Sequence, residues 1–291
     1  MTKKKKIMIP SSLNYHKATS VENAIQLLGQ FGPDAKLIAG GHSLLPAIKL
    51  RLNQPEHLID IGRIAGLKMI QTVGGKVVIG SACTHDQLAN AVAFRGALSM
   101  FRDAAAKIGD IQVRNMGTIG GSLAHADPAA DWPAVILASN ATLTIRGAAR
   151  SREVSASDFF TGFFTTDLQE DEIIETIQVP IPGTNSKSSY LKFEQPASRF
   201  AIVGCAVLID VSGGICDDIR IAFTGVSDMA FRDGGLEQAL RGKALSEDNI
   251  SASCELAAND AIVQSDHYAS ENYRKHLAKV YAKRAIKKAM E

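Results

Sequence analysis

Two glycine pairs in this sequence stand beside hydroxyl and imidazole side chains, and both could bind an anion. Gly40-Gly41 lies between an apolar strand-like segment and a helix-like one in LIAGGHSLLPAIKLRL, and Gly120-Gly121 lies in GTIGGS. Backbone without a Cβ lets a ligand approach closely, and free N–H groups at the start of a helix favour a phosphate. Two such turns could grip both phosphates of one dinucleotide, although a Gly-Gly pair alone is more commonly a plain turn.

Other motifs of nucleotide or catalytic chemistry are missing from the sequence. Neither glycine pair belongs to G-x-G-x-x-G or to the Walker pattern, and no H-E-x-x-H or G-x-S-x-G occurs. The four cysteines are widely spaced without a C-x-x-C pair, so we expect buried thiols rather than cluster ligands or disulfides. The pattern argues against metal hydrolysis, triad catalysis and an iron–sulfur cluster on this chain.

The composition is that of an ordinary globular protein. The chain has 291 residues, 46% apolar and 21% charged, which predicts two or three packed units. A net charge of +2 argues against nucleic acid as a partner. Because no apolar stretch approaches the roughly 20 residues of a membrane helix and no signal peptide is evident, we expect no membrane span and a cytoplasmic location. The lysine run at 3–6 is either a solvated end or an electrostatic tether.

The elements that must position the first glycine pair form a β-α-β-α unit at 1–55. The spacing Thr19-x-x-Glu22 predicts a capping box at the start of its first helix, and Gly32-Pro33 predicts its end. Pro46 is acceptable in the first turn of the second helix, where amides lack intrahelical partners. The predicted order is a strand at 7–9, a helix ending at 31, a strand at 36–39 and a helix through 44–50.

The second glycine pair lies in a mixed segment at 56–180. Gly74-Gly75 predicts a hairpin turn between two of its strands. The predicted strands are 57–61, 68–73, 76–79, 141–146 and a closing strand within 171–180. The predicted helices are 84–93, 96–108 and 132–139.

The final part, 181–291, begins with a polar linker at 182–189. YLKFE, AIVGCAVLIDV and IRIAFTGV predict three strands, with a turn at Gly213-Gly214 before the last. Helices are predicted at 235–240, 246–263 and 267–288. Strand-rich segments with appended helices indicate an α+β protein rather than a doubly wound sheet.

Long stretches of the sequence resemble one family. AGGHSLLP, KLRL and QVRNMGTIGGSLAHADPAADWPAVILA are similar to the FAD-binding medium subunit of the molybdenum hydroxylases, the carbon monoxide dehydrogenase and xanthine dehydrogenase family. The resemblance continues through IGSACTHDQL, FFTGFFTTDLQEDEIIETIQVP, YLKFEQPASRFAIVGCAV and FTGVSDMAFR, and so covers nearly the whole chain. It implies the vanillyl-alcohol-oxidase-type FAD-binding fold of two α/β subdomains, followed by a C-terminal domain of a three-stranded antiparallel sheet and a helical bundle.

The same resemblance implies two pyrophosphate loops. Hydroxyls would come from Thr118 and Ser122 and amides from Gly120 and Gly121, and His42 would contact phosphate rather than act as a catalyst. The implied loops consist of Ala39, Gly40, Gly41, His42 and Ser43, and of Thr118, Ile119, Gly120, Gly121 and Ser122.

Four further positions match residues near the flavin nucleotide. Asp131 matches an aspartate that hydrogen-bonds a nucleotide hydroxyl, or is a plain N-cap of the next helix. Lys192 matches a lysine near the flavin ring, or is a solvent-facing strand residue. Ile108 and Ile174 match apolar positions beside the ring systems, and core packing explains them equally. The sequence departs from the family in FEQPASRF, where Pro196 predicts an inserted turn.

The resemblance also implies partners. FAD would be bound noncovalently, and a large molybdenum-pterin subunit would oxidise the substrate. A small [2Fe-2S] subunit would pass electrons to FAD and onward to a quinone, NAD or dioxygen, in a dimer of heterotrimers. The substrate stays open among carbon monoxide, a purine and an aromatic N-heterocycle. The alternatives are a self-sufficient flavin oxidase of the vanillyl-alcohol-oxidase fold, or a non-enzymatic assembly protein.

Overall fold

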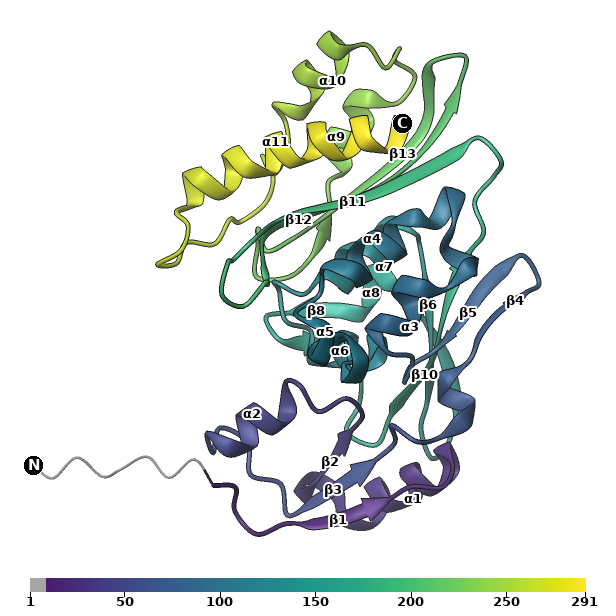
Figure 1. The fold of residues 1–291 in the computed structure, drawn as a ribbon, viewed down its shortest axis with the longest axis vertical. Helices are drawn as coiled ribbons and strands as arrows, with labels where there is room; N and C mark the ends of the chain where they lie inside the picture. Colours follow the sequence, from purple (N-terminus) through teal and green to yellow (C-terminus); the bar gives the residue numbers. More distant parts are fainter. Residues whose placement is uncertain (1–8) are drawn as a thin grey trace, which may run out of the picture.

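Residues 9–291 are described by a computed structural model, in which three main sheets follow one another along the long axis (Figure 1). The lysine run at 3–6 and most of the predicted strand at 7–9 lie outside the described residues, and Ile9 belongs to no strand. No helix among the described residues is long and apolar enough to cross a membrane.

The N-terminal lobe is a parallel sheet with strand order β1-β3-β2 and two helices. The sequence predicts the strand at 57–61 as part of the second segment, but the structure makes it the central strand of this first sheet. Parallel strands need crossover connections: α1 links the two edge strands β1 and β2, and α2 links β2 to its parallel neighbour β3. The elements of the lobe are β1 (Asn14–Lys17), α1 (Val21–Phe31), β2 (Ala35–Ile38), α2 (Leu44–Lys49) and β3 (His57–Asp60).

Helix α1 begins one residue later than predicted. Ser20 is its N-cap, and the Ser20 hydroxyl accepts a hydrogen bond from the Asn23 amide at 3.1 Å. The Asn23 side chain in turn accepts from the Thr19 amide at 3.2 Å. The predicted capping box between Thr19 and Glu22 is therefore wrong, because a neighbouring serine and an asparagine provide the reciprocal bonds instead.

The middle part is an antiparallel sheet of order β4-β5-β10-β6-β7 with helices packed on it. The strand predicted to close this segment, β10, is central, because it pairs with both β5 and β6. The hairpin at Gly74-Gly75 is confirmed by the β4–β5 pairing. The elements are β4 (Ile70–Val73), β5 (Lys76–Gly80), α3 (His85–Asn90), α4 (Ser99–Lys107), α5 (Ile111–Met116), α6 (Ile119–His125), α7 (Asp131–Ala138), β6 (Thr142–Arg146), β7 (Ser151–Ser155), α8 (Ala156–Phe159), β8 (Phe160–Gly162), β9 (Thr165–Thr166) and β10 (Ile173–Pro180).

The C-terminal part is an antiparallel sheet of order β11-β12-β13-β14, not the expected three strands. Its first strand starts at Ser186, inside the segment predicted to be a linker, and its last has only two residues. The predicted helix at 246–263 is shorter, since α10 ends at Cys254. The elements are β11 (Ser186–Glu194), β12 (Ala201–Ser212), β13 (Ile215–Thr224), β14 (Phe231–Arg232), α9 (Gly234–Leu240), α10 (Glu247–Cys254) and α11 (Glu271–Met290).

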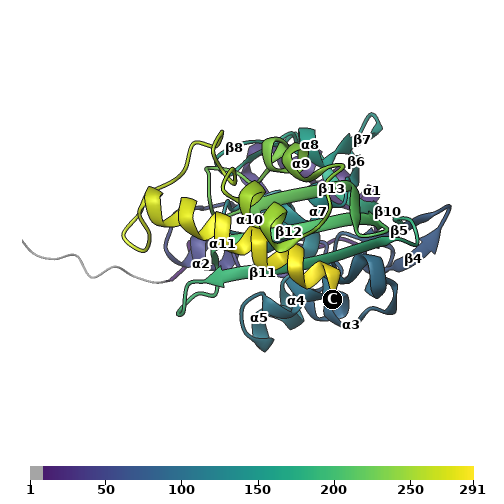
Figure 2. The same ribbon diagram turned by 90° about the horizontal axis from the view of Figure 1, so that it is seen from above.

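Both faces of this last sheet are covered. Helix α11 lies across β11 and β12 on one side (Figure 2), and α4 and α7 pack on the other. Along β12, Cys205, Val207 and Ile209 join the core beneath α11, whereas Ala206 and Leu208 join the core of the middle part. A strand buried on both faces shows a continuous apolar run. The middle and C-terminal parts therefore share a core.

The four cysteines are free and buried, as predicted. Burial raises the pKa of the Cys83 and Cys216 thiols to about 11 and that of Cys254 to about 12. The thiolate is the reactive and metal-binding form, so these thiols are inert packing groups at neutral pH.

Candidate functional site

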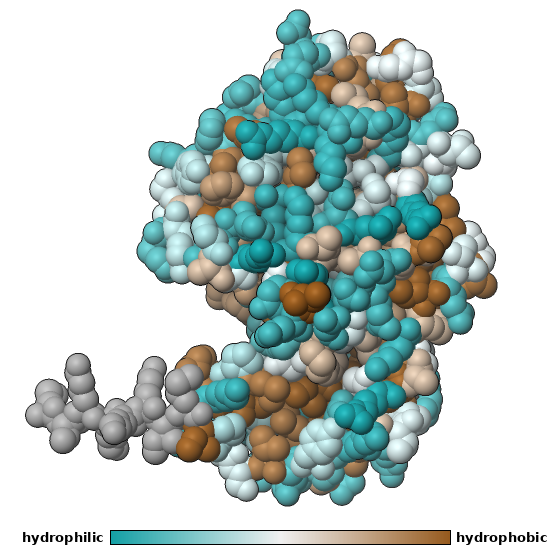
Figure 3. Space-filling model, viewed as in Figure 1, coloured by the Kyte–Doolittle hydropathy of each residue, from teal (hydrophilic) through white to brown (hydrophobic). Residues whose placement is uncertain are grey.

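A cavity of about 760 Å³ lies where the N-terminal lobe meets the rest of the molecule. The space-filling view shows this face indented between the lobe and the part above it (Figure 3). The cavity walls are β2 with the loop before α2, the helices α5 and α6 with the start of α7, and the loop after β11. Its volume is within the range of sites that enclose a small molecule or cofactor.

The loop at 39–43 presents unused backbone donors to this cavity. Within residues 9–291, the amides of residues 40–43 donate to no protein acceptor. Gly41 has a φ of +73°, a left-handed conformation that favours glycine. Consecutive free amides around such a residue form a concave donor surface suited to an anion.

Gly40 brings the two glycine stretches together. A Cβ at Gly40 would lie 2.2 Å from the carbonyl oxygen of Met116 and 2.7 Å from Cα of Gly117. Any side chain at this position would push the N-terminal lobe away from the segment that leads into α6. The bare backbone therefore lets the first loop lie directly against the second.

The second glycine pair is not a turn but the first turn of α6. Thr118 is the N-cap, and its hydroxyl accepts from the Gly121 amide at 3.1 Å. The Gly120 amide donates to the Ser81 carbonyl at 2.8 Å. The prediction that both glycine amides are free for a ligand is therefore wrong, because the protein itself uses them. Thr118 and Ser122 are the hydroxyl-bearing residues of this stretch that line the cavity.

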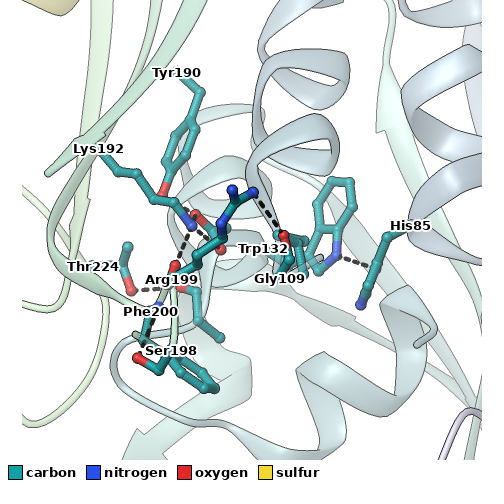
Figure 4. Close-up of polar contacts among 12 residues, drawn as sticks. His85, Gly109, Trp132, Tyr190, Lys192, Ser198, Arg199, Phe200 and Thr224 are labelled. Atoms are coloured by element: carbon teal, nitrogen blue, oxygen red, sulfur yellow. Dashed lines mark hydrogen bonds and ion pairs between the residues drawn. The ribbon is translucent and has the colours of Figure 1, made fainter. Parts of the chain in front are cut away.

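Asp131, which lines the cavity, forms a buried ion pair with Lys192, and Figure 4 shows the Lys192 side chain beside that of Tyr190. The Lys192 ammonium lies 3.0 Å from the Asp131 carboxylate and also donates to the Arg199 carbonyl at 2.6 Å. The Tyr190 hydroxyl donates to the same carboxylate at 2.6 Å. A Cβ at Gly204 would lie 2.4 Å from the Tyr190 oxygen, so glycine there leaves room for the hydroxyl.

Strand alternation places the two side chains that bond Asp131 on one face of β11. Tyr190 and Lys192 are two residues apart on β11, so their side chains share the face that meets α7. The stretch before Asp131 is anchored as well, because the Thr224 hydroxyl lies 2.7 Å from the Pro128 carbonyl and 2.6 Å from the Ala130 carbonyl.

Burial dominates the electrostatics of this network. It raises the pKa of the Asp131 carboxyl, and the Lys192 charge opposes that rise. Burial also raises the pKa of Tyr190 well above its ordinary value, with the Asp131 charge adding to the effect. Tyr190 is therefore a neutral donor, and the carboxylate is held by one cation and one hydroxyl.

A second buried pair lies beside the start of α6. The Trp132 indole N–H donates to His85 Nδ1 at 3.0 Å, as Figure 4 shows. Burial lowers the pKa of His85 to about 3, so the ring is neutral. The first residue of α3 is thereby fixed in orientation, and a capping box of Thr84 and Gln87 starts the helix.

The structure places most of the sequence-predicted residues around the cavity. Asp131 is not an N-cap, and Lys192 is not solvent-facing, because its side chain is only 1% exposed. Ile119 and Lys192 do not line the cavity: Ile119 is fully buried in the core and its amide donates to the Cys83 carbonyl. The predicted residues that line it are Ala39, Gly40, Gly41, His42, Ser43, Ile108, Thr118, Gly120, Gly121, Ser122, Asp131 and Ile174.

Several lining residues were not predicted individually. Ser81 and His85 come from IGSACTHDQL. Ser198, Arg199 and Phe200 come from FEQPASRF, the stretch in which the sequence departs from the family pattern. The turn predicted at Pro196 is present and carries these last three residues to the cavity. The capping pattern T-x-x-Q at Thr84 and Gln87 could have marked His85 as the first residue of α3, whereas no local pattern points to Ser81.

Comparison with known proteins agrees with this architecture. Residues 11–182 match the family model described as FAD binding domain in molybdopterin dehydrogenase, and residues 188–289 match CO dehydrogenase flavoprotein C-terminal domain. The carbon monoxide dehydrogenase medium chain of Hydrogenophaga pseudoflava is 40% identical over 97% of this chain and 98% of its own length. The glyceraldehyde dehydrogenase medium chain of Sulfolobus acidocaldarius is 36% identical over 96% of this chain and 99% of its own.

A solved structure of the Hydrogenophaga pseudoflava carbon monoxide dehydrogenase has a TM-score of 0.93 to this fold, with 41% identity and coverage of 97% of this chain and 98% of that one. The fold and the cavity thus define an FAD-binding oxidoreductase subunit. The chain belongs to the family of medium, FAD-binding subunits of molybdenum hydroxylases, in which large and small subunits are the partners.

The cavity residues fit an FAD. The free amides of 40–43 suit a phosphate, and the apolar side chains of Ile108 and Ile174 suit an aromatic ring. Ser81 Oγ is buried at the cavity wall with no hydrogen-bond partner among the described residues. Such an orphaned polar group is expected where a ligand completes the site.

Proposed function

We propose that this cavity holds one FAD noncovalently and that the chain relays electrons from a [2Fe-2S] subunit to an external acceptor. The observation that carries the proposal is the convergence of both glycine stretches on one cavity. Flavin suits a relay because, when bound, it accepts electrons singly and releases one or two. The protein contributes position, donors and a defined charge environment.

The residues of the first loop are proposed to bind the pyrophosphate. The free amides of residues 40–43 can donate hydrogen bonds to an anion, so no positively charged side chain is required there. His42 lies in the same loop. The hydroxyls of Thr118 and Ser122, two residues that also line the cavity, are proposed to add hydrogen bonds from the second glycine stretch. Ala39, Gly120 and Gly121 contribute bare surface rather than donors.

Asp131 is proposed to accept a hydrogen bond from a hydroxyl of the nucleotide. Asp131 lines the cavity, and a carboxylate retains acceptor capacity after bonding Tyr190 and Lys192. Lys192 does not line the cavity and is proposed to act through Asp131, by keeping that carboxylate ionised and oriented. The role of Lys192 near the flavin ring is thus indirect in this proposal.

The partners are proposed in more detail from the relatives. The large subunit would carry the molybdenum-pterin cofactor and the substrate pocket, the small subunit the [2Fe-2S] clusters, in a cytoplasmic dimer of heterotrimers. Medium chains similar to this one serve enzymes of carbon monoxide and of glyceraldehyde, so the substrate is decided outside this chain. These relatives are complex subunits, which disfavours a self-sufficient oxidase.

Expressing the full chain alone and recording its absorbance tests the proposal. We expect a flavin spectrum at one FAD per chain, released on denaturation because the bond is noncovalent. A chain that neither carries flavin nor takes up added FAD would contradict the proposal. Turnover of an alcohol by the isolated chain would favour the self-sufficient oxidase instead, and failure to copurify with molybdenum or iron–sulfur subunits would favour an assembly protein.

A further inference from the structure

Ser81 and His85 place two side-chain donors at one wall of the cavity. The Ser81 hydroxyl is buried and has no hydrogen-bond partner among the described residues, although the residue lines the cavity. His85 is also buried and lines the same cavity. Neither residue belongs to the glycine loops, and a buried donor without a partner is costly unless a ligand supplies one.

The tautomer of His85 follows from its neighbour. An indole N–H can only donate, so the Trp132 bond at 3.0 Å makes His85 Nδ1 an acceptor. In a neutral imidazole the proton then resides on Nε2. Figure 4 shows that nitrogen on the side of the ring away from Trp132. His85 is therefore a neutral side chain with one fixed N–H donor.

These donors lie at the junction of the two glycine stretches. A Cβ at Gly117 would be 2.7 Å from His85 Nε2, and a Cβ at Gly120 would be 2.5 Å from Cβ of Ser81. Gly117 is also the residue against which Gly40 packs. Both donors thus border the segment 117–120, and Gly117 of this segment lies against Gly40 of the loop that holds the free amides.

The charges of the cavity show why neutral donors are needed there. Lining carboxylates are Asp127, Asp131 and Glu172, whereas the lining lysine and arginine are Lys36 and Arg199. The guanidinium of Arg199 already donates to the Gly109 carbonyl. A dianionic group in this cavity therefore has to be stabilised mainly by N–H and O–H dipoles.

We propose that Ser81 Oγ and His85 Nε2 donate hydrogen bonds to the phosphate oxygens of the bound cofactor, forming a third anion-binding element between the two glycine stretches. A phosphate oxygen is an acceptor without a proton, which matches the fixed Nε2–H donor. Trp132 is the positioning residue, because it holds the tautomer and the ring orientation. This inference rests on the proposed binding of FAD.

The test measures the dissociation constant of FAD for the full chain, after its flavin has been removed. Ser81→Ala and His85→Asn are each expected to weaken FAD about 10- to 100-fold, as for a lost hydrogen bond to a charged group. His85→Gln, which can place an amide donor near the Nε2 position, should lose less. Ser139→Ala is the control, since Ser139 is also a buried serine, its hydroxyl donates to the Ile136 carbonyl of α7, and it does not line the cavity.

Competition identifies the part of the cofactor concerned. Binding of ADP should weaken in parallel with FAD in both variants, whereas binding of riboflavin, which has no phosphate, should not change. Removing the orphaned hydroxyl by Ser81→Ala should leave the stability of the flavin-free chain unchanged or higher. Loss of affinity without loss of stability separates a ligand contact from a structural role.

Nitrogen-15 NMR of His85 tests the inference without a variant. The Nε2–H tautomer is expected in the flavin-free chain, with a shift of the Nε2 resonance on adding ADP. Wild-type affinities of Ser81→Ala and His85→Asn for FAD and ADP would overturn the inference, as would an unchanged Nε2 resonance. A wild-type chain that binds no FAD would instead contradict the proposed function.

Discussion

His85 should make the protein lose stability at mildly acidic pH by a predictable amount. Its pKa falls from an ordinary value of 6.5 to about 3 because the ring is buried, with His42 and Arg114 adding smaller effects. His85 is protonated near pH 6.5 in the unfolded chain, but in the folded chain it stays neutral until the pH falls to about 3. The stabilising contribution of His85 is therefore complete above pH 6.5 and is lost as the pH falls toward 3.

The size of the effect follows from the number of protons taken up. One proton bound by the unfolded state alone changes the free energy of unfolding by about 1.4 kcal/mol per pH unit. At pH 5 the contribution lost is about 2 kcal/mol, and at pH 3 it is about 4 kcal/mol. Domains are stable by only about 5–15 kcal/mol, so the loss is large.

Urea unfolding between pH 7.5 and 5 measures this slope. Trp132 is the single tryptophan of the chain and contacts His85, so its fluorescence reports the relevant region. His85→Asn and His85→Gln cannot titrate, and their stability should fall with pH less steeply by about 1.4 kcal/mol per unit. Equal slopes in the wild type and both variants would refute the argument that His85 is buried and neutral.

Two further predictions concern the cavity. Gly41→Val should abolish flavin retention with the fold largely kept, since its φ of +73° disfavours a branched side chain and its Cβ would lie 3.0 Å from Leu45. Gly121→Val should do the same, because its Cβ would lie 2.9 Å from the Thr118 hydroxyl oxygen. Stoichiometric flavin absorbance in both variants would contradict the proposal that the two glycine stretches bind one cofactor. Lys192→Met should lower the free energy of unfolding by about 3–5 kcal/mol, because it leaves a buried carboxylate without its cation. Adding Asp131→Asn should restore part of that loss in a double-mutant cycle, whereas additive losses would show that the two residues are not coupled.

The sequence predicted local elements well where one signal governed them. The hairpin at Gly74-Gly75, the three long C-terminal strands and the start of the helix near residue 132 follow from turn residues and apolar runs. Errors arose where two local signals competed. Ser20 rather than Thr19 caps the first helix, and the polar residues before Tyr190 predict a linker although Ser186 and Ser188 are buried in a strand.

Pairing between distant segments could not be predicted from local patterns. The strand at His57–Asp60 follows the N-terminal helices in sequence yet enters the middle of their sheet. Strand β10 is likewise central, because it pairs with β5 on one side and β6 on the other, and both of these strands precede it in the chain. Periodicity indicates that a strand exists, but it carries no information about which neighbour it bonds.

By itself, the sequence determined the family, the cofactor class and the two glycine stretches, because those residues are needed for close backbone approach whatever surrounds them. Only the tertiary structure decided how the glycines are used. The amides of Gly40–Ser43 are free, whereas those of Gly120 and Gly121 donate hydrogen bonds to Ser81 and Thr118. The structure also paired Lys192 with Asp131 across two parts of the chain. Burial and hydrogen-bond partners belong to the packed arrangement, so no spacing of residue types could have revealed them.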